Sequence, residues 1–215
     1  MTQQTEHTLP DLLRPALDLV FVGINPSVFS ALQGHYFARK INRFWPCFSR
    51  SALSQPIRHA LGVERLEPHH DRLLPAHGIG FTDVVKRPTA KAAELDRNEF
   101  AAGAAALVTK LERYQPRVAC FQGMMGYRPF AAVLGSTERT LVLGAQPLLL
   151  GQTQVFVVPS PSSANAHFTP AQQTEWYDRL ADHLQIASRS SATDLRTPSS
   201  GGSNRSSCSI DKTSS

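Results

Sequence analysis

Residues 17–27 read LDLVFVGINPS, an apolar run of strand length that passes into a turn containing glycine, asparagine and proline. An apolar run of this length, bounded by a turn, is typical of a strand that is buried on both faces of a sheet. Three later runs also predict strands, and small or polar residues follow each of them. They are Ile79–Thr82, Arg117–Phe121 and Gln154–Val158.

Helical patterns lie between and after these runs. Glu99–Tyr114 carries apolar residues at helical spacing and stops before Pro116. Thr169 and Pro170 suit the N-cap and the first position of a further helix. Strands that alternate with helices predict an α/β fold, a three-layer sandwich with a short, mainly parallel central sheet. Ligands of such sheets bind at the carboxyl ends of the strands, so the residues after each strand are the candidates for function.

The composition suits a soluble protein with one packed domain. The chain has 215 residues, of which 41% are hydrophobic and 18% charged. Its net charge of +5 favours a polyanion or an anionic surface as partner. The N-terminus lacks an apolar signal core and no window has the length of a membrane span. We therefore expect an intracellular protein, cytoplasmic and nucleoid-associated in a bacterium or nuclear in a eukaryote, without a membrane.

Cysteine usage argues against several kinds of site. Cys47, Cys120 and Cys208 are far apart and form no CxxC pair. This spacing disfavours a disulfide framework, a structural zinc site and an iron–sulfur cluster. Cys120 lies in an apolar run and is interpreted as a core residue.

The chain divides into three parts by composition. Residues 1–14 are interpreted as an N-terminal extension and 15–186 as the globular domain. Residues 187–215 are rich in serine, threonine and glycine, and we expect them to be a disordered tail.

Four segments that follow or surround the expected strands carry unusual residues. They are Gly23–Ser27, Gly34–Trp45, Gly78–Thr89 and Pro159–Phe168. Taken alone, Asn25-Pro26 is ordinary turn chemistry, and Phe44 and Trp45 are core anchors. The second segment also interleaves aromatic residues with cations, a pattern that suits a stacked base and its phosphates.

In their order and combination, these segments resemble the mismatch-specific uracil-DNA and thymine-DNA glycosylase family. The family's GINPG motif corresponds to Gly23–Ser27, and its aromatic loop and N-R/H-F-W motif correspond to Gly34–Phe37 and Asn42–Trp45. Further stretches match the family at Gly78–Thr82, Val85–Thr89, Lys110–Arg117 and Pro161–Ser163. The resemblance covers about residues 15 to 186 and implies a uracil-DNA glycosylase-like catalytic domain.

The resemblance implies a role for individual residues. A glycosylase flips the nucleotide out of the duplex and holds the base in a pocket. Asn25 is similar to the residue that positions the attacking water, and Phe37 to the aromatic on which the base stacks. The expected substrate-binding residues are Gly23, Ile24, Tyr36, Phe37, Asn42, Ser162 and Ser163. Neither a cofactor nor a metal is expected, and the histidine-rich loop around His69 and His70 is interpreted as solvated.

The sequence departs from the family pattern at three positions. Ser27 replaces the usual glycine beside Asn25. The late loop, Pro159–Phe168, lacks the arginine that usually fills the space left in the duplex by the flipped nucleotide. We expect Asn165 to insert there as the wedge. Asp83 is acidic where the best-known members carry a neutral or basic residue. Its carboxylate either acts on water or on the sugar, as in glycoside hydrolysis, or pairs with a neighbouring cation at the surface.

The expected partner is double-stranded DNA with a uracil or a mismatch lesion, with single-stranded DNA as a further candidate. The expected DNA-binding residues are Lys40, Arg43, Lys86 and Arg87, which with Arg39 form a phosphate-binding rim, and the wedge Asn165. We expect a monomeric DNA glycosylase that removes uracil, with Asn25 and Asp83 as catalytic residues. Thymine and other damaged bases opposite guanine are further candidate substrates.

Two rival functions remain open. The first is a non-catalytic protein of the same fold that binds mismatches or abasic sites. The second, an α/β serine hydrolase, is disfavoured because the chain has no GxSxG turn.

Overall fold

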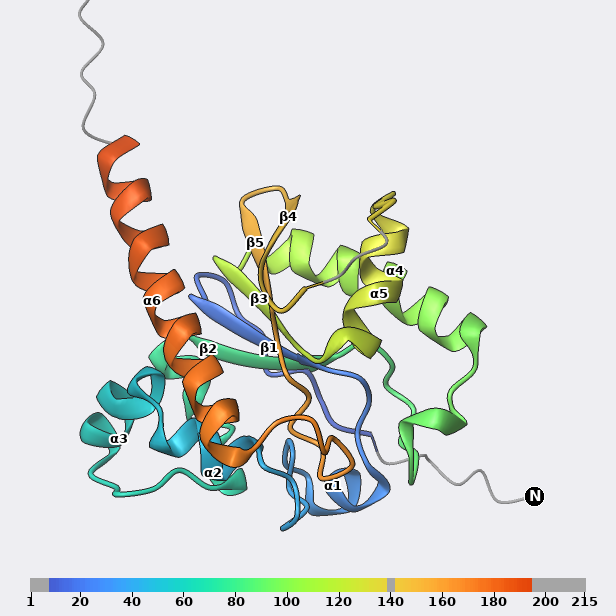
Figure 1. The fold of residues 1–215 in the computed structure, drawn as a ribbon, viewed down its shortest axis with the longest axis horizontal. Coiled ribbons are helices and arrows are strands. Elements are labelled where there is room, and N and C mark those ends of the chain that lie inside the picture. Colours follow the sequence, from blue (N-terminus) through green and yellow to red (C-terminus); the bar gives the residue numbers. More distant parts are fainter. Residues whose placement is uncertain (1–7, 139–141, 195–215) are drawn as a thin grey trace, which may run out of the picture.

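The computed structural model describes residues 8–138 and 142–194, and beyond residue 185 only the helical backbone. Within these residues the strands form one five-stranded sheet in the order β2-β1-β3-β5-β4 (Figure 1). Their bounds are β1 Leu19–Gly23, β2 Ile79–Asp83, β3 Val118–Gln122, β4 Gly144–Leu150 and β5 Thr153–Val158. All neighbouring pairs are parallel except β4 with β5. The mainly parallel sheet predicted from the sequence is confirmed.

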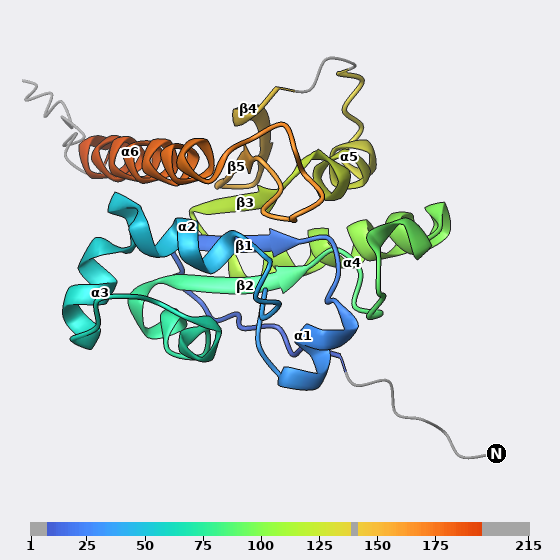
Figure 2. The same cartoon turned by 60° about the horizontal axis from the view of Figure 1, so that its bottom comes forward.

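Helices cover both faces of this sheet. Within the described residues they are α1 Val28–Gln33, α2 Phe44–Arg50, α3 Gln55–Leu61, α4 Arg97–Tyr114, α5 Met124–Val133 and α6 Pro170–Asp194. Short 3-10 turns occupy Ala52–Ser54, Pro68–His70, Leu74–His77 and Ala92–Glu94. Figure 2 shows α2 and α6 on one side of the strands and α4 on the other. The predicted three-layer sandwich is therefore also confirmed.

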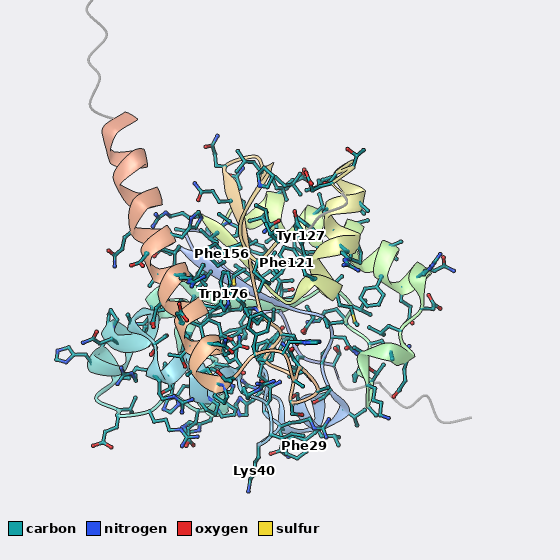
Figure 3. The ribbon with its side chains drawn as sticks, in the orientation of Figure 1. Phe29, Lys40, Phe121, Tyr127, Phe156 and Trp176 are labelled. Atoms are coloured by element: carbon teal, nitrogen blue, oxygen red, sulfur yellow. The ribbon has the colours of Figure 1, made fainter. Side chains whose placement is uncertain are left out.

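Strand β1 separates two hydrophobic cores. Leu19 and Phe21 belong to a cluster with residues of α2, α3 and α6, whereas Val20 and Val22 belong to a cluster with residues of α4 and α5. Successive side chains of a strand point to opposite faces, so an uninterrupted apolar run serves both cores. Figure 3 shows Phe121 and Tyr127 close together; their rings meet edge to face at 5.5 Å within the second core.

The C-terminal helix is longer than the sequence predicts. Thr169 caps it as expected, because its hydroxyl accepts a hydrogen bond from the backbone N–H of Gln172. The helix then continues to Asp194, eight residues into the segment that the sequence predicts as a disordered tail from residue 187. Serine and threonine are weak helix breakers, and propensity alone does not end a helix. Residues 195–215, which include Cys208, lie outside the described residues.

The N-terminal segment is part of the domain from residue 8 onward, in contrast to the extension predicted for residues 1–14. Leu9 is 1% exposed and joins the core shared with α2 and α6. Leu12 forms an antiparallel bridge with Phe81 of β2. Leu9, Leu12 and Leu13 stand in a short stretch interrupted by Pro10 and ended by Pro15, so spacing alone does not reveal this packing. Within the described residues, no helix is long and apolar enough to cross a membrane.

Leu9→Ala tests whether the N-terminal segment stabilises the domain. Removing a buried leucine side chain should cost about 2–5 kcal/mol of unfolding free energy. Leu32→Ala is the matched control, since Leu32 is 68% exposed, and it should change stability by no more than about 0.5 kcal/mol. Chemical denaturation of both variants measures the difference. Equal stabilities would show that residues 8–14 are a dispensable extension.

Candidate active site

A cleft of about 700 Å³ opens at the carboxyl ends of the parallel strands. Gly23, Asp83 and Gln122 are the last residues of β1, β2 and β3, and each lines the cleft. All of the predicted catalytic and substrate-binding residues also line it: Gly23, Ile24, Asn25, Tyr36, Phe37, Asn42, Asp83, Ser162 and Ser163. The four segments singled out in the sequence thus meet in one place, as the strand-end rule for α/β sheets requires.

The carboxamide of Asn25 is held in one orientation. Its Nδ2 donates to the backbone carbonyl of Arg87 and to Oγ1 of Thr89, both at 2.8 Å. The carbonyl of Arg87 can only accept a hydrogen bond, and the Thr89 hydroxyl already donates its hydrogen to the carbonyl of Lys91. Both groups therefore need a donor from Asn25, so the NH₂ group of the carboxamide must face them. Among the described residues none donates to Oδ1, which is therefore available to accept a hydrogen bond in the cleft.

Asp83 is buried at the bottom of the cleft, with an exposed fraction of 2%. It stands opposite Gly23 in the parallel register of β1 and β2. A Cβ atom at position 23 would overlap with Oδ1 of Asp83, so only glycine leaves room for the carboxylate. Burial raises the pKa of Asp83 to about 6, and the ammonium group of Lys86 opposes this rise.

Of the alternative that Asp83 pairs with a cation at the surface, the structure shows the pairing with Lys86 but not the surface position. Oδ2 of Asp83 lies 3.4 Å from Nζ of Lys86, but the carboxylate is buried. Arg87, the other candidate partner, instead binds Glu99 through both carboxylate oxygens, at 2.5 and 2.9 Å. Asp83 is therefore a buried acid in the cleft.

Aromatic side chains form one wall of the cleft. The ring of Phe37 stacks on Phe44 with centroids 4.4 Å apart, and Phe44 is fully buried. Phe37 has a positive φ of 54°, an unfavourable conformation for a large side chain. Such strain is often kept where a side chain must face a ligand. Trp45 donates through Nε1 to the carbonyl of Tyr36, so Phe44 and Trp45 are core anchors as predicted.

Arg43 holds the late loop rather than lying free on the rim. Its guanidinium donates to the backbone carbonyls of Ser162, Asn165 and Phe168. The backbone N–H of Arg43 donates to the backbone carbonyl of Pro161. A planar group with five donors is suited to gathering several carbonyls of one loop. The prediction that Arg43 binds phosphate is therefore not supported by its contacts.

Asn165 lines the cleft but its side chain is turned back into its own loop. Nδ2 donates to the carbonyl of Ser160, and Oδ1 accepts from the N–H of His167. This arrangement does not present the amide as a wedge. Asn42 has a comparable local role, because its Oδ1 accepts from the N–H of Phe44 at the start of α2.

Of the other predicted phosphate-binding residues, Lys40 keeps an exposed position. Figure 3 shows its side chain pointing away from the protein. Arg39 is exposed and lines the mouth of the cleft. Lys86 is turned inward toward Asp11 and Asp83, and Arg87 binds Glu99.

Sequence reasoning missed two polar residues of the cleft and misjudged a third nearby. Gln122 is 3% exposed and is the last residue of β3. Its position at the carboxyl end of a strand is the one signal in the sequence that could have identified it. Thr89 belongs to a matched motif, yet its contact with Asn25 is not evident from spacing. Asp71 was expected in a solvated loop, but it is buried and accepts from the N–H of Tyr36. Among the described residues, no group of three or more potential metal ligands occurs.

The cleft of this α/β sandwich combines an aromatic wall, an oriented carboxamide and a buried carboxylate, which together suit the binding of a flat, polar group. The sequence matches the model of the uracil DNA glycosylase superfamily over residues 10–184. The chain therefore belongs to this superfamily, whose members are DNA glycosylases. The match begins at residue 10, in agreement with the packing of the N-terminal segment.

The fold is also similar to a solved structure. This is the solution NMR structure of a candidate uracil DNA glycosylase from Methanosarcina acetivorans. The TM-score is 0.50 at 21% sequence identity, and the match covers 84% of this chain and 98% of that chain. At this identity the similarity supports the fold alone.

Asp83→Asn should make the protein more stable at pH 8. The folded-state pKa of Asp83, about 6, exceeds the ordinary value of 3.8. The stability that this group contributes is therefore complete below pH 4 and is lost as the pH rises through 6. An amide resembles the protonated carboxyl, so the variant should gain roughly 1–3 kcal/mol at pH 8 and little at pH 3.5.

Denaturation at both pH values measures this gain. Asp182→Asn, which changes an exposed aspartate of α6, is the control and should shift stability by no more than about 0.5 kcal/mol. A lower stability of Asp83→Asn at pH 8 would contradict the buried-acid interpretation.

Proposed function

We propose that this DNA glycosylase is of the mismatch-specific kind and hydrolyses the N-glycosidic bond of uracil in DNA. Asn25 orients the attacking water and Asp83 accepts its proton. The observation that carries the proposal is the fixed carboxamide of Asn25, whose Nδ2 is bound twice and whose Oδ1 is available in the cleft. Thymine and other damaged bases opposite guanine are further candidate substrates.

The proposed reaction separates two tasks between two side chains. The water oxygen forms a bond to C1′ of the sugar while the bond from C1′ to the base nitrogen breaks, and the base departs with the bonding electrons. An amide can accept a hydrogen bond from this water but is a poor proton acceptor. The carboxylate of Asp83 lines the same cleft and takes the proton, or stabilises the positive charge that develops on the sugar.

The aromatic wall supports a role in holding the flipped base. Phe37 is half-buried, lines the cleft, and is backed by the fully buried Phe44. Stacking on an aromatic ring stabilises a base by about 1–3 kcal/mol, independent of its identity. Gly23, at the end of β1, and Ile24, just after it, line the same cleft and carry no polar side chain.

The rival function is a non-catalytic protein that binds the same lesions. A binding protein needs the aromatic wall and the exposed cations, but it has no use for an acid buried beside a glycine. Burying an ionisable group costs stability, and such a cost is typically kept where the group has a function. The combination of Asn25 and Asp83 therefore favours the enzyme.

Single-turnover excision from U:G, U:A, T:G and single-stranded uracil substrates tests both catalytic assignments. Asn25→Ala should slow excision by roughly 10²–10⁴-fold, and Asp83→Asn by a factor in the same range. Because Asp83 must be ionised to accept a proton, the wild-type rate should fall as the pH drops through about 6. Lesion binding should survive in both variants.

Asn98→Ala, which removes an exposed amide at the start of α4, is the matched control and should leave the rate unchanged. A wild-type rate in Asn25→Ala would sink the water-orienting role. If the wild-type protein binds these substrates but cleaves none, the non-catalytic rival is correct.

Lys40→Ala should weaken DNA binding and reduce its salt dependence. The side chain of Lys40 is exposed near the cleft mouth, and each lost phosphate contact lowers the slope of log affinity against log salt by about 0.9. Arg113→Ala is the control, because Arg113 lies in the last turn of α4, close in sequence to the amino end of β3 and away from the cleft. Fluorescence anisotropy at several salt concentrations measures both slopes. Equal slopes for wild type and Lys40→Ala would exclude Lys40 from the interface.

A further inference from the structure

A cluster of charged side chains lies directly behind Asp83. Nζ of Lys86 is 2.9 Å from Oδ1 of Asp11 and 3.4 Å from Oδ2 of Asp83, and it donates to the hydroxyl of Tyr36 at 3.2 Å. The other carboxylate oxygen of Asp11 lies 2.7 Å from Nζ of Lys110. The cluster therefore contains two carboxylates and two ammonium groups.

Three distant parts of the chain supply these groups. Asp11 belongs to the segment before β1, Lys86 follows β2, and Lys110 belongs to α4. Thr82 of β2 fixes Asp11 further by donating to its Oδ1 at 2.7 Å. The side chains of the two lysines and of Asp11 are only 25–29% exposed, so solvent screens their interactions little.

We propose that Lys86 and Asp11 are positioning residues that set the ionisation of Asp83. Lys86 keeps the buried carboxylate charged, and Asp11 draws part of the Lys86 charge away from it. The proposal rests on the proposed function, in which Asp83 must be ionised to take a proton. It assigns to Lys86 a task inside the protein in place of the phosphate contact that the sequence suggested.

The charges around Asp83 support opposite effects of the two residues. An ammonium group at 3.4 Å favours the ionised carboxylate, whereas the nearby carboxylate of Asp11 disfavours it. Lys110 acts in the same direction as Lys86. Burial and the carboxylates raise the pKa of Tyr36 above its ordinary value, so this phenol stays neutral. On the side of β1, Asp83 faces Gly23, which carries no charge.

Two substitutions in the full-length protein should therefore move the titration of Asp83 in opposite directions. Lys86→Met removes the stabilising cation and should raise the titration midpoint by about 1–3 pH units. Asp11→Asn leaves two cations opposed by Asp83 alone and should lower the midpoint. Lys86→Arg keeps the charge and should restore a midpoint near that of the wild type. The acid limb of the pH–rate profile for excision should follow each shift.

The midpoint is measured directly by NMR titration of the Asp83 side-chain carboxyl carbon, with Asp83→Asn used to assign the signal. Single-turnover excision over the same pH range is measured separately. If Lys86→Met does not fold, Lys86→Gln has the same loss of charge and the same expected sign. A purely structural role would loosen the packing, admit water and lower the midpoint in both variants, so the upward shift in the Lys86 variant is decisive.

Unchanged midpoints, or shifts of the same sign in both variants, would overturn the proposal. Opposite shifts in the NMR titration support it whatever the activity does. If the rates then fail to follow the titration, the role of Asp83 in the reaction is wrong, while the control of its ionisation by Lys86 and Asp11 stands. The two failures are thus distinguishable.

Discussion

The cleft depends on one close approach, that of the Asp83 carboxylate to the backbone of Gly23. The in-register parallel pairing of β1 and β2 brings these two residues together, and a side chain at position 23 would displace the carboxylate. The same register continues beyond the strands, where Val85 donates to the carbonyl of Ile24 and Thr89 to that of Pro26. This continuation brings the Thr89 hydroxyl to Asn25. A shift of register by one residue would separate both contacts at once, because side chains of a strand alternate between faces.

Positive charge near the cleft serves two separate purposes. Arg43 and Lys86 are residue types that commonly bind phosphate, yet both side chains bind groups of the protein itself. Arg43 gathers carbonyls of the late loop, and Lys86 compensates two carboxylates. Arg39 and Lys40 remain at the surface. Net charge therefore indicates attraction to a polyanion, but the count of cations in a motif overstates the number that can reach a phosphate.

The strands and the residues that line the cleft could be predicted because they depend on local sequence patterns. Apolar runs ending in small or polar residues located β1 and β3 to within two residues, and the strand-end rule placed Asn25 and Asp83 at one site. What could not be predicted depends on contacts between distant residues. The burial of Leu9 depends on a core formed by distant elements, and the folded orientation of Asn165 depends on its own loop. The antiparallel β4, Gly144–Leu150, contains Pro147 and a run of three leucines, so its sequence gives no clear strand signal, and its register with β5 is irregular.

In the proposed mechanism, the burial that weakens the fold is also what makes Asp83 useful. A carboxylate with its ordinary pKa is a poor proton acceptor at neutral pH, and a general base is most effective when its pKa lies close to the working pH. Desolvation raises the pKa of Asp83 to about 6, which strengthens it as a base. Further desolvation without a counter-charge would leave it protonated and inactive. Lys86 limits the rise, and Asp11 prevents Lys86 from cancelling it. The site thus requires both a buried acid and a partly neutralised cation behind it, which explains why an exposed ion pair could not replace this arrangement.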